Sequence, residues 1–243
     1  FEGAVVTDWG GSNDHALGVK NGSTLEMPFP GGDSIRELKA AVESGRITEA
    51  DIDARLDELM ELVLDTHAAV EQAPKTFDAD AHHKLACRAA AESVVLLKNE
   101  GGLLPLQAGE KIAVIGDFAQ TPRYQGAGSS AVNSIKVDSV LEKLEESGLV
   151  SAGFAPGFDR QGKPDAARKA EAVELAKKAN VVLLFLGLDE IKESEGLDRA
   201  DMQLAKNQLE LLDAISAVNP NVVVVLSAGS SLETPWLASC RAL

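Results

Sequence analysis

Two segments of this sequence carry acidic side chains in settings where they could do chemistry. In the first, Asp8 follows the apolar run 3–7 and precedes Trp9. A carboxylate at the end of a strand could act on a bound sugar, while the neighbouring indole stacks on the sugar ring or shields the carboxylate. Asp is also an ordinary turn and helix-cap residue, so this local pattern alone leaves both interpretations open.

The second acidic segment, residues 189–199, holds five carboxylates in eleven positions after an apolar run. Crowded carboxylates repel one another, and this raises their pKa values toward the range that a general acid needs near neutral pH. We expect Gly196 to let the loop present Glu195, and Asp198 and Arg199 to anchor the loop through ionic contacts. A solvated acidic loop with no catalytic role fits the same pattern.

A glycine-rich turn at residues 123–130 reads Arg-Tyr-Gln-Gly-Ala-Gly-Ser-Ser. Its small residues would let a sugar ring approach the backbone, and its Ser and Gln side chains offer hydrogen bonds. The turn lacks the third glycine of the G-x-G-x-x-G fingerprint, and no helix is predicted directly after it. A nucleotide site on a Rossmann-like sheet is therefore the weaker alternative.

Histidine and cysteine side chains do not show the spacing of a metal site. His82 and His83 are adjacent near a helix start, without a partner four residues away, and we expect a solvent-facing helix turn. Cys87 and Cys240 lie far apart, and we expect two reduced, mostly buried thiols. Reduced thiols favour a cytoplasmic location.

The composition limits the classes of partner. The chain has 243 residues, 45% of them hydrophobic, with a formal net charge of −15 and a pI near 4.7. So acidic a protein repels phosphates, which argues against a nucleic-acid partner but is compatible with a neutral carbohydrate. No stretch approaches the roughly 20 apolar residues of a membrane span, so we expect no membrane partner.

Residues 1–66 alternate strand and helix in the rhythm of βα units around a parallel sheet or barrel. Ser34 and Glu37 have the form of a capping box, and Gly45 stands where a helix C-cap belongs. The polar residues 67–80 are interpreted as a linker. The predicted elements are strands 3–7 and 24–27 and helices 14–21, 34–45 and 48–66.

Residues 81–243 alternate apolar strands with amphipathic helices, which indicates a parallel sheet covered on both faces. The predicted strands are 111–116, 151–154, 180–187 and 221–227. The predicted helices are 80–99, 137–146, 164–179 and 203–218, with Pro164 at a first helical position. Ligands of such sheets bind beyond the carboxyl ends of the strands, where residues 117–130 and 189–199 begin.

Taken together and in order, five segments resemble glycoside hydrolase family 3, specifically its β-glucosidase-like members. Thr7-Asp8-Trp9-Gly10 is similar to the family's nucleophile motif, with Thr7 where serine is usual, and Ser194 replaces a usual glycine in the segment of the acid/base. The resemblance covers essentially the whole chain. The segments are residues 1–11, 25–28 with 45–47, 89–99 with 103–106, 125–130 and 194–199.

For the fold, the resemblance implies an α/β protein in two parts. Residues 1–66 would be the C-terminal end of a (β/α) barrel, residues 67–80 a linker, and residues 81–243 a parallel-sheet, three-layer α/β sandwich. The chain would be truncated at both ends, because the family's first six or so barrel strands and its last sandwich strands have no counterpart here.

For the chemistry, the resemblance implies retaining hydrolysis of terminal β-linked sugars, as in a β-glucosidase, with Asp8 as the nucleophile and Glu195 as the acid/base. No metal or organic cofactor is required. The remaining residues of the implied sugar site are Trp9, Arg123, Tyr124, Gln125, Gly128 and Ser129.

The missing barrel strands carry most contacts to the sugar in that family. We therefore expect the isolated chain to be inactive, with the missing barrel portion of the same enzyme as its natural partner. Residues 1–66 would be the less stable part, or would dock on the sandwich or on a second copy of the chain; docking on a second copy would give a homo-oligomer. The alternative function is a non-catalytic sandwich module that supports a barrel or binds sugar weakly.

Overall fold

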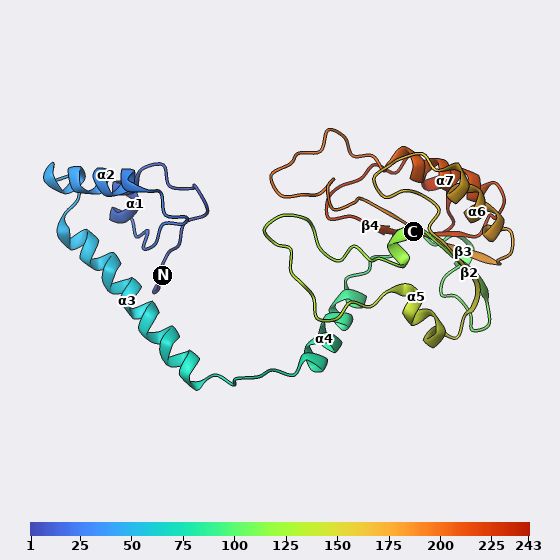
Figure 1. Ribbon diagram of the computed structural model, residues 1–243, viewed down its shortest axis with the longest axis horizontal. Helices are drawn as coiled ribbons and strands as arrows, with labels where there is room; N and C mark the ends of the chain where they lie inside the picture. The colour runs from blue at the N-terminus through green and yellow to red at the C-terminus, as the bar shows by residue number, and fades with distance from the viewer. The chain divides into compact units, whose positions relative to one another are not determined.

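The computed structural model describes all residues, 1–243, and divides into two compact units. The first comprises residues 1–79 and the second residues 80–243. Figure 1 shows the first unit as mostly helical and the second as a sheet with surrounding helices. Each unit is described by itself below.

The first unit contains three helices: α1 (His15–Lys20), α2 (Gly32–Glu43) and α3 (Glu49–Gln72). The strands predicted at 3–7 and 24–27 are reduced to one parallel bridge between Val6 and Leu25. Backbone hydrogen bonds support it, with the Thr7 amide donating to the Leu25 carbonyl over 3.0 Å. The two segments run parallel, as the strands of neighbouring βα units do. Two paired segments without further strands, however, do not form a regular sheet.

The helix ends of this unit differ from the predicted ones. Ser34 does not form a capping box, because α2 begins earlier, after Gly31, and Ser34 is buried inside its first turn. Thr48 does cap α3, in a reciprocal capping box with Asp51. Helix α3 runs six residues into the predicted linker, since its sequence favours helix until Pro74, which disfavours the helical conformation in the residue before it.

The apolar core of the first unit is small. Its fully buried members are Ala16, Ala41 and Ile47, whereas α3 buries no residue completely. On the apolar face predicted for α3, Leu56 and Val63 are half exposed. No helix in the structure is long and apolar enough to cross a membrane.

The second unit is built on a four-stranded, wholly parallel sheet in the order β2-β1-β3-β4, which confirms the predicted α/β class. Its helices are shorter than predicted. For example, Asp165 rather than a preceding residue caps α6, so Pro164 lies outside the helix. The strands are β1 (Lys111–Ile115), β2 (Val150–Ala155), β3 (Val181–Gly187) and β4 (Val222–Ser227), and the helices are α4 (Ala79–Glu92), α5 (Val140–Lys143), α6 (Ala166–Ala176) and α7 (Lys206–Ser216).

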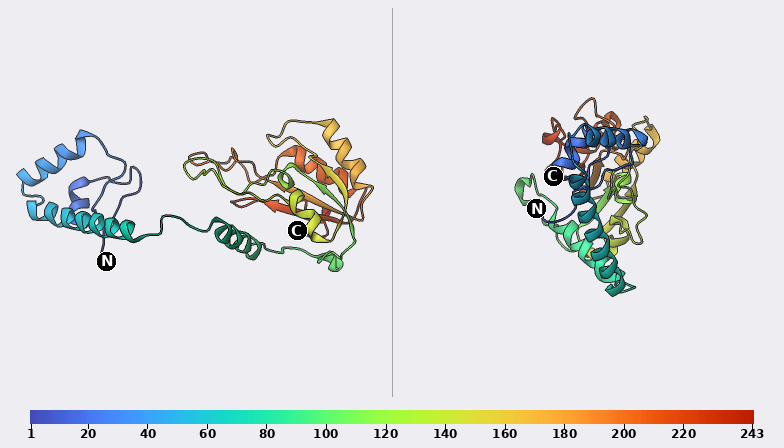
Figure 2. Two further views of the ribbon diagram at one scale, coloured as in Figure 1. Left: turned by 60° about the horizontal axis from the view of Figure 1, so that its bottom comes forward. Right: turned by 90° about the vertical axis from the view of Figure 1, so that its left-hand side faces the viewer.

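The connections place helices on both faces of this sheet. The chain moves from β1 outward to β2, then crosses back over β1 to β3 and continues to β4. Right-handed crossovers in opposite directions put their helices on opposite faces. Accordingly, α5 lies on one side of the sheet and α6 and α7 lie on the other (Figures 1 and 2). The strand order reverses between β1 and β3, and a crevice for ligands forms at such a point.

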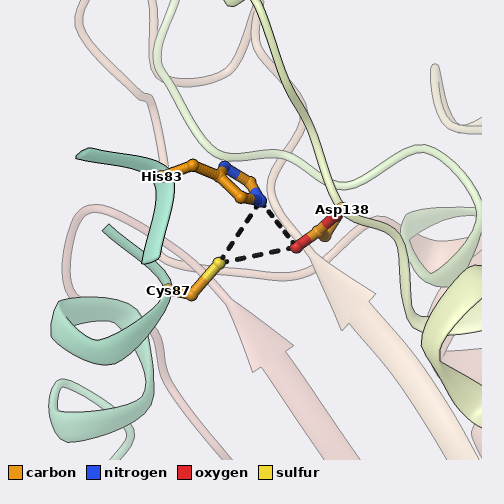
Figure 3. A group of neighbouring side chains, drawn as sticks. All are labelled: His83, Cys87 and Asp138. Atoms are coloured by element: carbon orange, nitrogen blue, oxygen red, sulfur yellow. Dashed lines mark hydrogen bonds and ion pairs between the residues drawn. The ribbon is translucent and has the colours of Figure 1, made fainter. Parts of the chain in front are cut away.

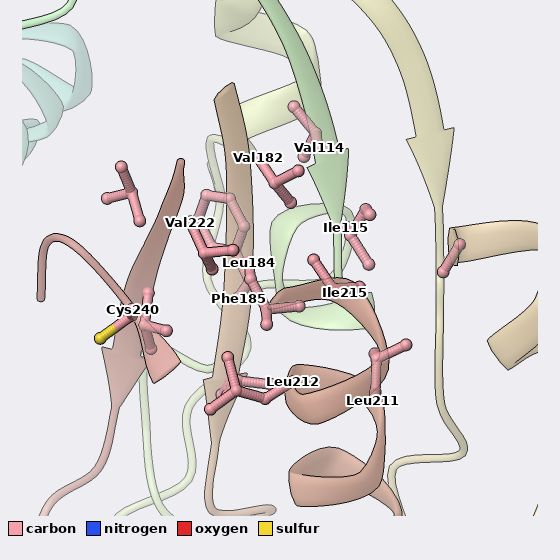
Figure 4. Packing of buried hydrophobic residues seen from close by; sticks show 14 of the residues in the cluster. Val114, Ile115, Val182, Leu184, Phe185, Leu211, Leu212, Ile215, Val222 and Cys240 are labelled. Atoms are coloured by element: carbon pink, nitrogen blue, oxygen red, sulfur yellow. The ribbon is translucent and has the colours of Figure 1, made fainter. Parts of the chain in front are cut away.

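The core of the second unit lies between the sheet and α7 (Figure 4). Leu211, Leu212 and Ile215 of α7 face the sheet and are fully buried. Val114 and Leu184 on β1 and β3 are also fully buried. At about 25 cal/mol per Å² of apolar surface, such continuous burial provides the main stabilisation of this unit.

Helix α4 ends at Glu92, seven residues before its predicted end. Beyond it, the chain is extended, and the Leu97 and Lys98 amides donate to the Leu243 carbonyl over 2.8 and 3.1 Å. The residues near the C-terminus in turn pair with β4, where the Val224 amide donates to the Ala242 carbonyl over 2.9 Å. β-Branched Val94 and Val95 favour this extended course over a helix.

The difference between the two cores predicts a difference in local stability. Backbone amides of β1, β3 and β4 should exchange with solvent far more slowly than those of α2 and α3, because opening the sheet exposes a large buried core. Hydrogen exchange followed by mass spectrometry would measure this. Equal protection of residues 1–66 and 110–230 in a monomeric sample would contradict it.

Candidate active site

Two polar loops meet where the strand order reverses. The loop after β1 contains residues 123–130, and the loop after β3 contains residues 189–199. Ala127 and Ser194 form a parallel bridge, and the Glu195 amide donates to the Ala127 carbonyl over 3.1 Å. A cleft of about 510 Å³ opens beside this contact, lined by residues of both loops and by Gly229 and Ser230 after β4.

Glu195 is held at this cleft by Ser129. Its Oε2 accepts hydrogen bonds from the Ser129 amide, over 2.8 Å, and from the Ser129 hydroxyl. Gly128 makes the approach possible, since a Cβ at that position would lie 2.6 Å from Cβ of Glu195, and its φ of +112° is itself a glycine conformation. Both donors contact Oε2, which leaves Oε1 to exchange a proton with a ligand.

The raised pKa predicted for this acidic loop is wrong for Glu195. Hydrogen bonds from the Ser129 side chain and then from its backbone amide stabilise the carboxylate, and they lower its pKa below the ordinary value of 4.5. Shielding from solvent opposes this effect but is smaller. These hydrogen bonds therefore favour the ionised form of Glu195, which is the form of a base.

The predicted crowding does not arise, because three of the other four carboxylates of the loop have separate partners. Asp189 accepts a hydrogen bond from the Lys192 amide over 2.7 Å. Glu190 pairs with Arg160, at 2.9 Å between Oε1 and the guanidinium nitrogen. Glu193 pairs with Arg123. Each partner fixes the direction of one carboxylate, so their charges are spread over the loop.

The Arg123–Glu193 pair is the most enclosed of these contacts, with both side chains only 8% exposed. Glu193 also accepts hydrogen bonds from the Gly229 amide, over 2.9 Å, and from the Ser230 hydroxyl. Burial opposes its ionisation, but these hydrogen bonds and the Arg123 charge outweigh it and keep the pKa of Glu193 below its ordinary value. Sequence reasoning assigned Arg123 to sugar contact, whereas here its guanidinium is engaged by Glu193.

Arg160, which sequence reasoning missed, supports the loops beside the cleft without lining it. It contacts Glu190 and Asp117, with 2.7 Å from its Nε to the Asp117 carboxylate, and lies 4.5 Å from the centre of the Phe118 ring. It thereby ties the loop after β2 to the loops after β1 and β3. The sequence offered a weak signal, namely a single Arg in the loop that follows the strand predicted at 151–154, at the sheet edge where the loops after the other strands also begin.

Tyr124 and Gln125 differ in their availability to a ligand. The Gln125 amide bridges its own loop, accepting from the Val132 amide over 2.9 Å and donating to the Val132 carbonyl over 3.1 Å. The Tyr124 side chain is half exposed. Gln125 therefore closes the glycine-rich loop, while the Tyr124 ring is open to solvent.

The remaining predicted residues, Asp8 and Trp9, belong to the first unit. Asp8 is exposed and its Oδ1 accepts a hydrogen bond from the Trp9 amide over 2.8 Å. The Trp9 ring is 73% exposed. Just before them, the Thr7 hydroxyl accepts from the Met27 amide over 2.9 Å and so fixes the end of the paired segment.

Comparisons with known proteins agree with this architecture. The sequence pattern of the glycosyl hydrolase family 3 C-terminal domain matches residues 94–243. The chain belongs to glycosyl hydrolase family 3. Over its full length it is 45% identical to an exo-α-(1→6)-L-arabinopyranosidase of Bifidobacterium breve and 37% identical to the thermostable β-glucosidase B of Acetivibrio thermocellus. It spans about a third of each of these relatives, at 33% and 32%.

A solved structure extends the likeness to three dimensions. The family 3 β-glucosidase of Bifidobacterium adolescentis matches the whole chain with a TM-score of 0.89 at 44% identity, over 36% of its own length. The resemblance to family 3 seen in the sequence is thus confirmed, as is the fold class. The relatives carry about two thirds of their length outside the region matched here.

Loss of Glu193 should detach the acidic loop from its anchors. Glu193→Ala would leave the Arg123 guanidinium buried without a counter-charge, and removing one partner of a buried pair destabilises a protein by about 3 kcal/mol. Urea unfolding of the full chain would measure the change. The exposed Glu145→Ala is a matched control, expected within about 0.5 kcal/mol of the unmodified protein. Equal effects of the two substitutions would contradict the anchoring role.

Ser129→Ala should raise the pKa of Glu195 toward 4.5, because it removes the largest cause of the depression. A depressed pKa means that ionised Glu195 stabilises the fold above its ordinary pKa, and that this stability is lost as pH falls through the folded value. The variant should therefore lose less stability on acidification. Carbon-detected NMR titration of the Glu195 carboxyl would measure the shift, with Ser130→Ala as the control. An unchanged pKa in Ser129→Ala would refute the assignment.

Proposed function

We propose that this chain is part of a retaining glycosidase that cleaves terminal β-linked sugars of the β-glucoside type, with Glu195 as the acid/base and Asp8 as the nucleophile. One observation carries the proposal. Glu195 stands at a cleft where the strand order of the sheet reverses, held by Ser129 and admitted by Gly128. The identity to family 3 enzymes over the full chain supports the assignment of reaction class.

In this mechanism Glu195 donates a proton to the glycosidic oxygen while Asp8 attacks the anomeric carbon. Water then hydrolyses the glycosyl–Asp8 intermediate, with Glu195 as the base. Retention requires the two carboxyl groups to approach within about 5–5.5 Å in the working enzyme. The depressed pKa of Glu195 suits the second step, and its unengaged Oε1 suits exchange of the proton.

The donor step needs protonated Glu195, so its pKa must rise when substrate binds. The Ser129 hydroxyl can reorient toward a sugar hydroxyl, and a bound sugar excludes water from the cleft. Both changes weaken stabilisation of the carboxylate and favour the acid form. We therefore assign Ser129 a part in setting the pKa of Glu195 as well as in lining the site.

A second candidate substrate is a terminal α-L-arabinopyranoside. The B. breve relative, 45% identical, is an exo-α-(1→6)-L-arabinopyranosidase. An α-L-arabinopyranoside and a β-D-glucoside both carry an equatorial leaving group, so one pair of carboxylates can serve either. Choice between them would rest on contacts to the sugar's outer hydroxyl groups.

A chimera tests the proposal, because this chain spans only about a third of the length of its relatives. In the chimera, this chain replaces the matching 36% of the B. adolescentis β-glucosidase. Glu195→Ala should abolish cleavage of an alkyl glucoside, whose leaving group needs a proton. It should spare the first step for a dinitrophenyl glucoside. Azide, which needs no base, should then restore turnover and give a glycosyl azide of retained configuration.

Two further variants of the chimera are controls. Glu190→Ala should keep wild-type-like preference between the two leaving groups, because Glu190 pairs with Arg160. Asp8→Ala should show no azide rescue with retained configuration, since no intermediate can form. If Glu195→Ala slows both substrates equally and ignores azide, its assignment as acid/base is wrong. Testing aryl glucosides beside aryl α-L-arabinopyranosides in the unmodified chimera distinguishes the two substrate classes.

A further inference from the structure

Away from the cleft, three side chains gather where α4 meets the segment that precedes α5 (Figure 3). His83 and Cys87 lie one helical turn apart on α4, and Asp138 comes from the segment before α5. The Nε2 atom of His83 is 3.0 Å from Oδ2 of Asp138. The Cys87 sulfur is 3.4 Å from the same oxygen and 3.6 Å from the same nitrogen.

These separations match those of ligands around one tetrahedral cation. Zn²⁺ binds nitrogen and oxygen at about 2.0–2.1 Å and sulfur at about 2.3 Å, so neighbouring ligand atoms stand about 3.3–3.6 Å apart. The observed triangle has sides of 3.0, 3.4 and 3.6 Å. A cation therefore fits after movements of a few tenths of an ångström.

The same geometry argues against a nucleophilic cysteine. In a Cys-His-Asp triad the thiol and the carboxylate contact different ring nitrogens, whereas here Cys87 and Asp138 both face Nε2 of His83. The imidazole therefore cannot relay a proton from sulfur to the carboxylate, and the cluster does not have the geometry of a catalytic triad.

We propose that His83, Cys87 and Asp138 form a binding site for a divalent cation of the zinc class. Imidazole and thiolate are ligands that suit Zn²⁺, and the neutral imidazole with two anionic ligands balances its charge. Water would take the fourth position, as in zinc sites with three protein ligands. Lys143 lies near Asp138, but its Nζ is 4.0 Å from Oδ1, the oxygen that faces away from the cluster.

The role that this site would serve is to fasten α4. This helix buries no residue completely, and polar contacts, including Lys136 with Asp80, connect it to the segment before α5. A cation bound to both segments would cross-link them. Because it binds the folded form, it would stabilise the helix by mass action.

Two sequence expectations change with this finding. His83 was predicted to have no partner four residues away, but Cys87 occupies that position. Cys87, expected to be buried, is exposed, whereas Cys240 is buried. The cluster escapes local patterns because its third member, Asp138, lies 51 residues beyond Cys87.

Titration of the full-length chain with Zn²⁺ alone, by isothermal calorimetry, tests the site. We expect one Zn²⁺ per chain. Since losing even a residue that only supports a metal ligand lowers affinity about 10–100-fold, His83→Ala, Cys87→Ser and Asp138→Asn should each lower affinity at least about tenfold. His82→Ala, one residue from the cluster, and Cys240→Ser, the buried thiol, should leave it unchanged. The Cys and Asp variants conserve volume and His82 is exposed, whereas His83 is partly buried, so circular dichroism checks the folding of all five variants.

Cobalt gives an independent readout of the ligands. Co²⁺ added to the chain should produce a sulfur-to-cobalt charge-transfer band that Cys87→Ser abolishes and Cys240→Ser retains. Zn²⁺ should also slow hydrogen exchange of the α4 amides in the unmodified chain, but it should not do so in His83→Ala. Three results would each overturn the proposal. They are Zn²⁺ binding that survives Cys87→Ser, Zn²⁺ binding that is lost equally in His82→Ala, and a cobalt spectrum without the sulfur band.

Discussion

The geometry of the cleft depends on one enclosed ion pair, between Arg123 and Glu193. Through it the loops after β1 and β3 are joined, and through Gly229 and Ser230 the loop after β4 is added. Burying a pair of charges costs desolvation that attraction alone seldom offsets. Here several hydrogen-bond donors offset the desolvation cost of the Glu193 carboxylate, whereas the Nε of Arg123 has no hydrogen-bond partner. Such an arrangement contributes more to position than to stability.

The proposed role of Glu195 requires that its carboxylate be held in a defined position. Glu195 stands two residues after Glu193, so an anchored Glu193 fixes the backbone from which Glu195 projects, and Ser129 fixes its carboxylate. A general acid or base must reach the reacting atoms within hydrogen-bond distance, and a loop free to move would lose that geometry. The second unit thus orients its carboxylate by its own contacts.

The sheet of the second unit was predictable from sequence because buried parallel strands are continuous apolar runs, as in Val181–Gly187. The ends of the helices were less predictable from sequence, because capping depends on single residues such as Asp165. The loops around Glu195 and Ser129 were placed correctly beyond strand ends. The direction of the Glu195 pKa shift was not predicted, because it depends on Ser129, which lies 66 residues away in the sequence and which no local pattern reveals.

The two candidate carboxylates are supported very differently. Glu195 projects from a sheet with a continuous buried core, whereas Asp8 follows a segment joined to its neighbour by one parallel bridge. Proximity can contribute roughly 7–11 kcal/mol to catalysis only when the reacting groups are held in place. In this chain Glu195, the proposed acid/base, is held by defined contacts, whereas Asp8, the proposed nucleophile, is not. Further parallel strands beside Val6 and Leu25 would supply such a constraint, because paired segments hold the residues that follow them in fixed positions.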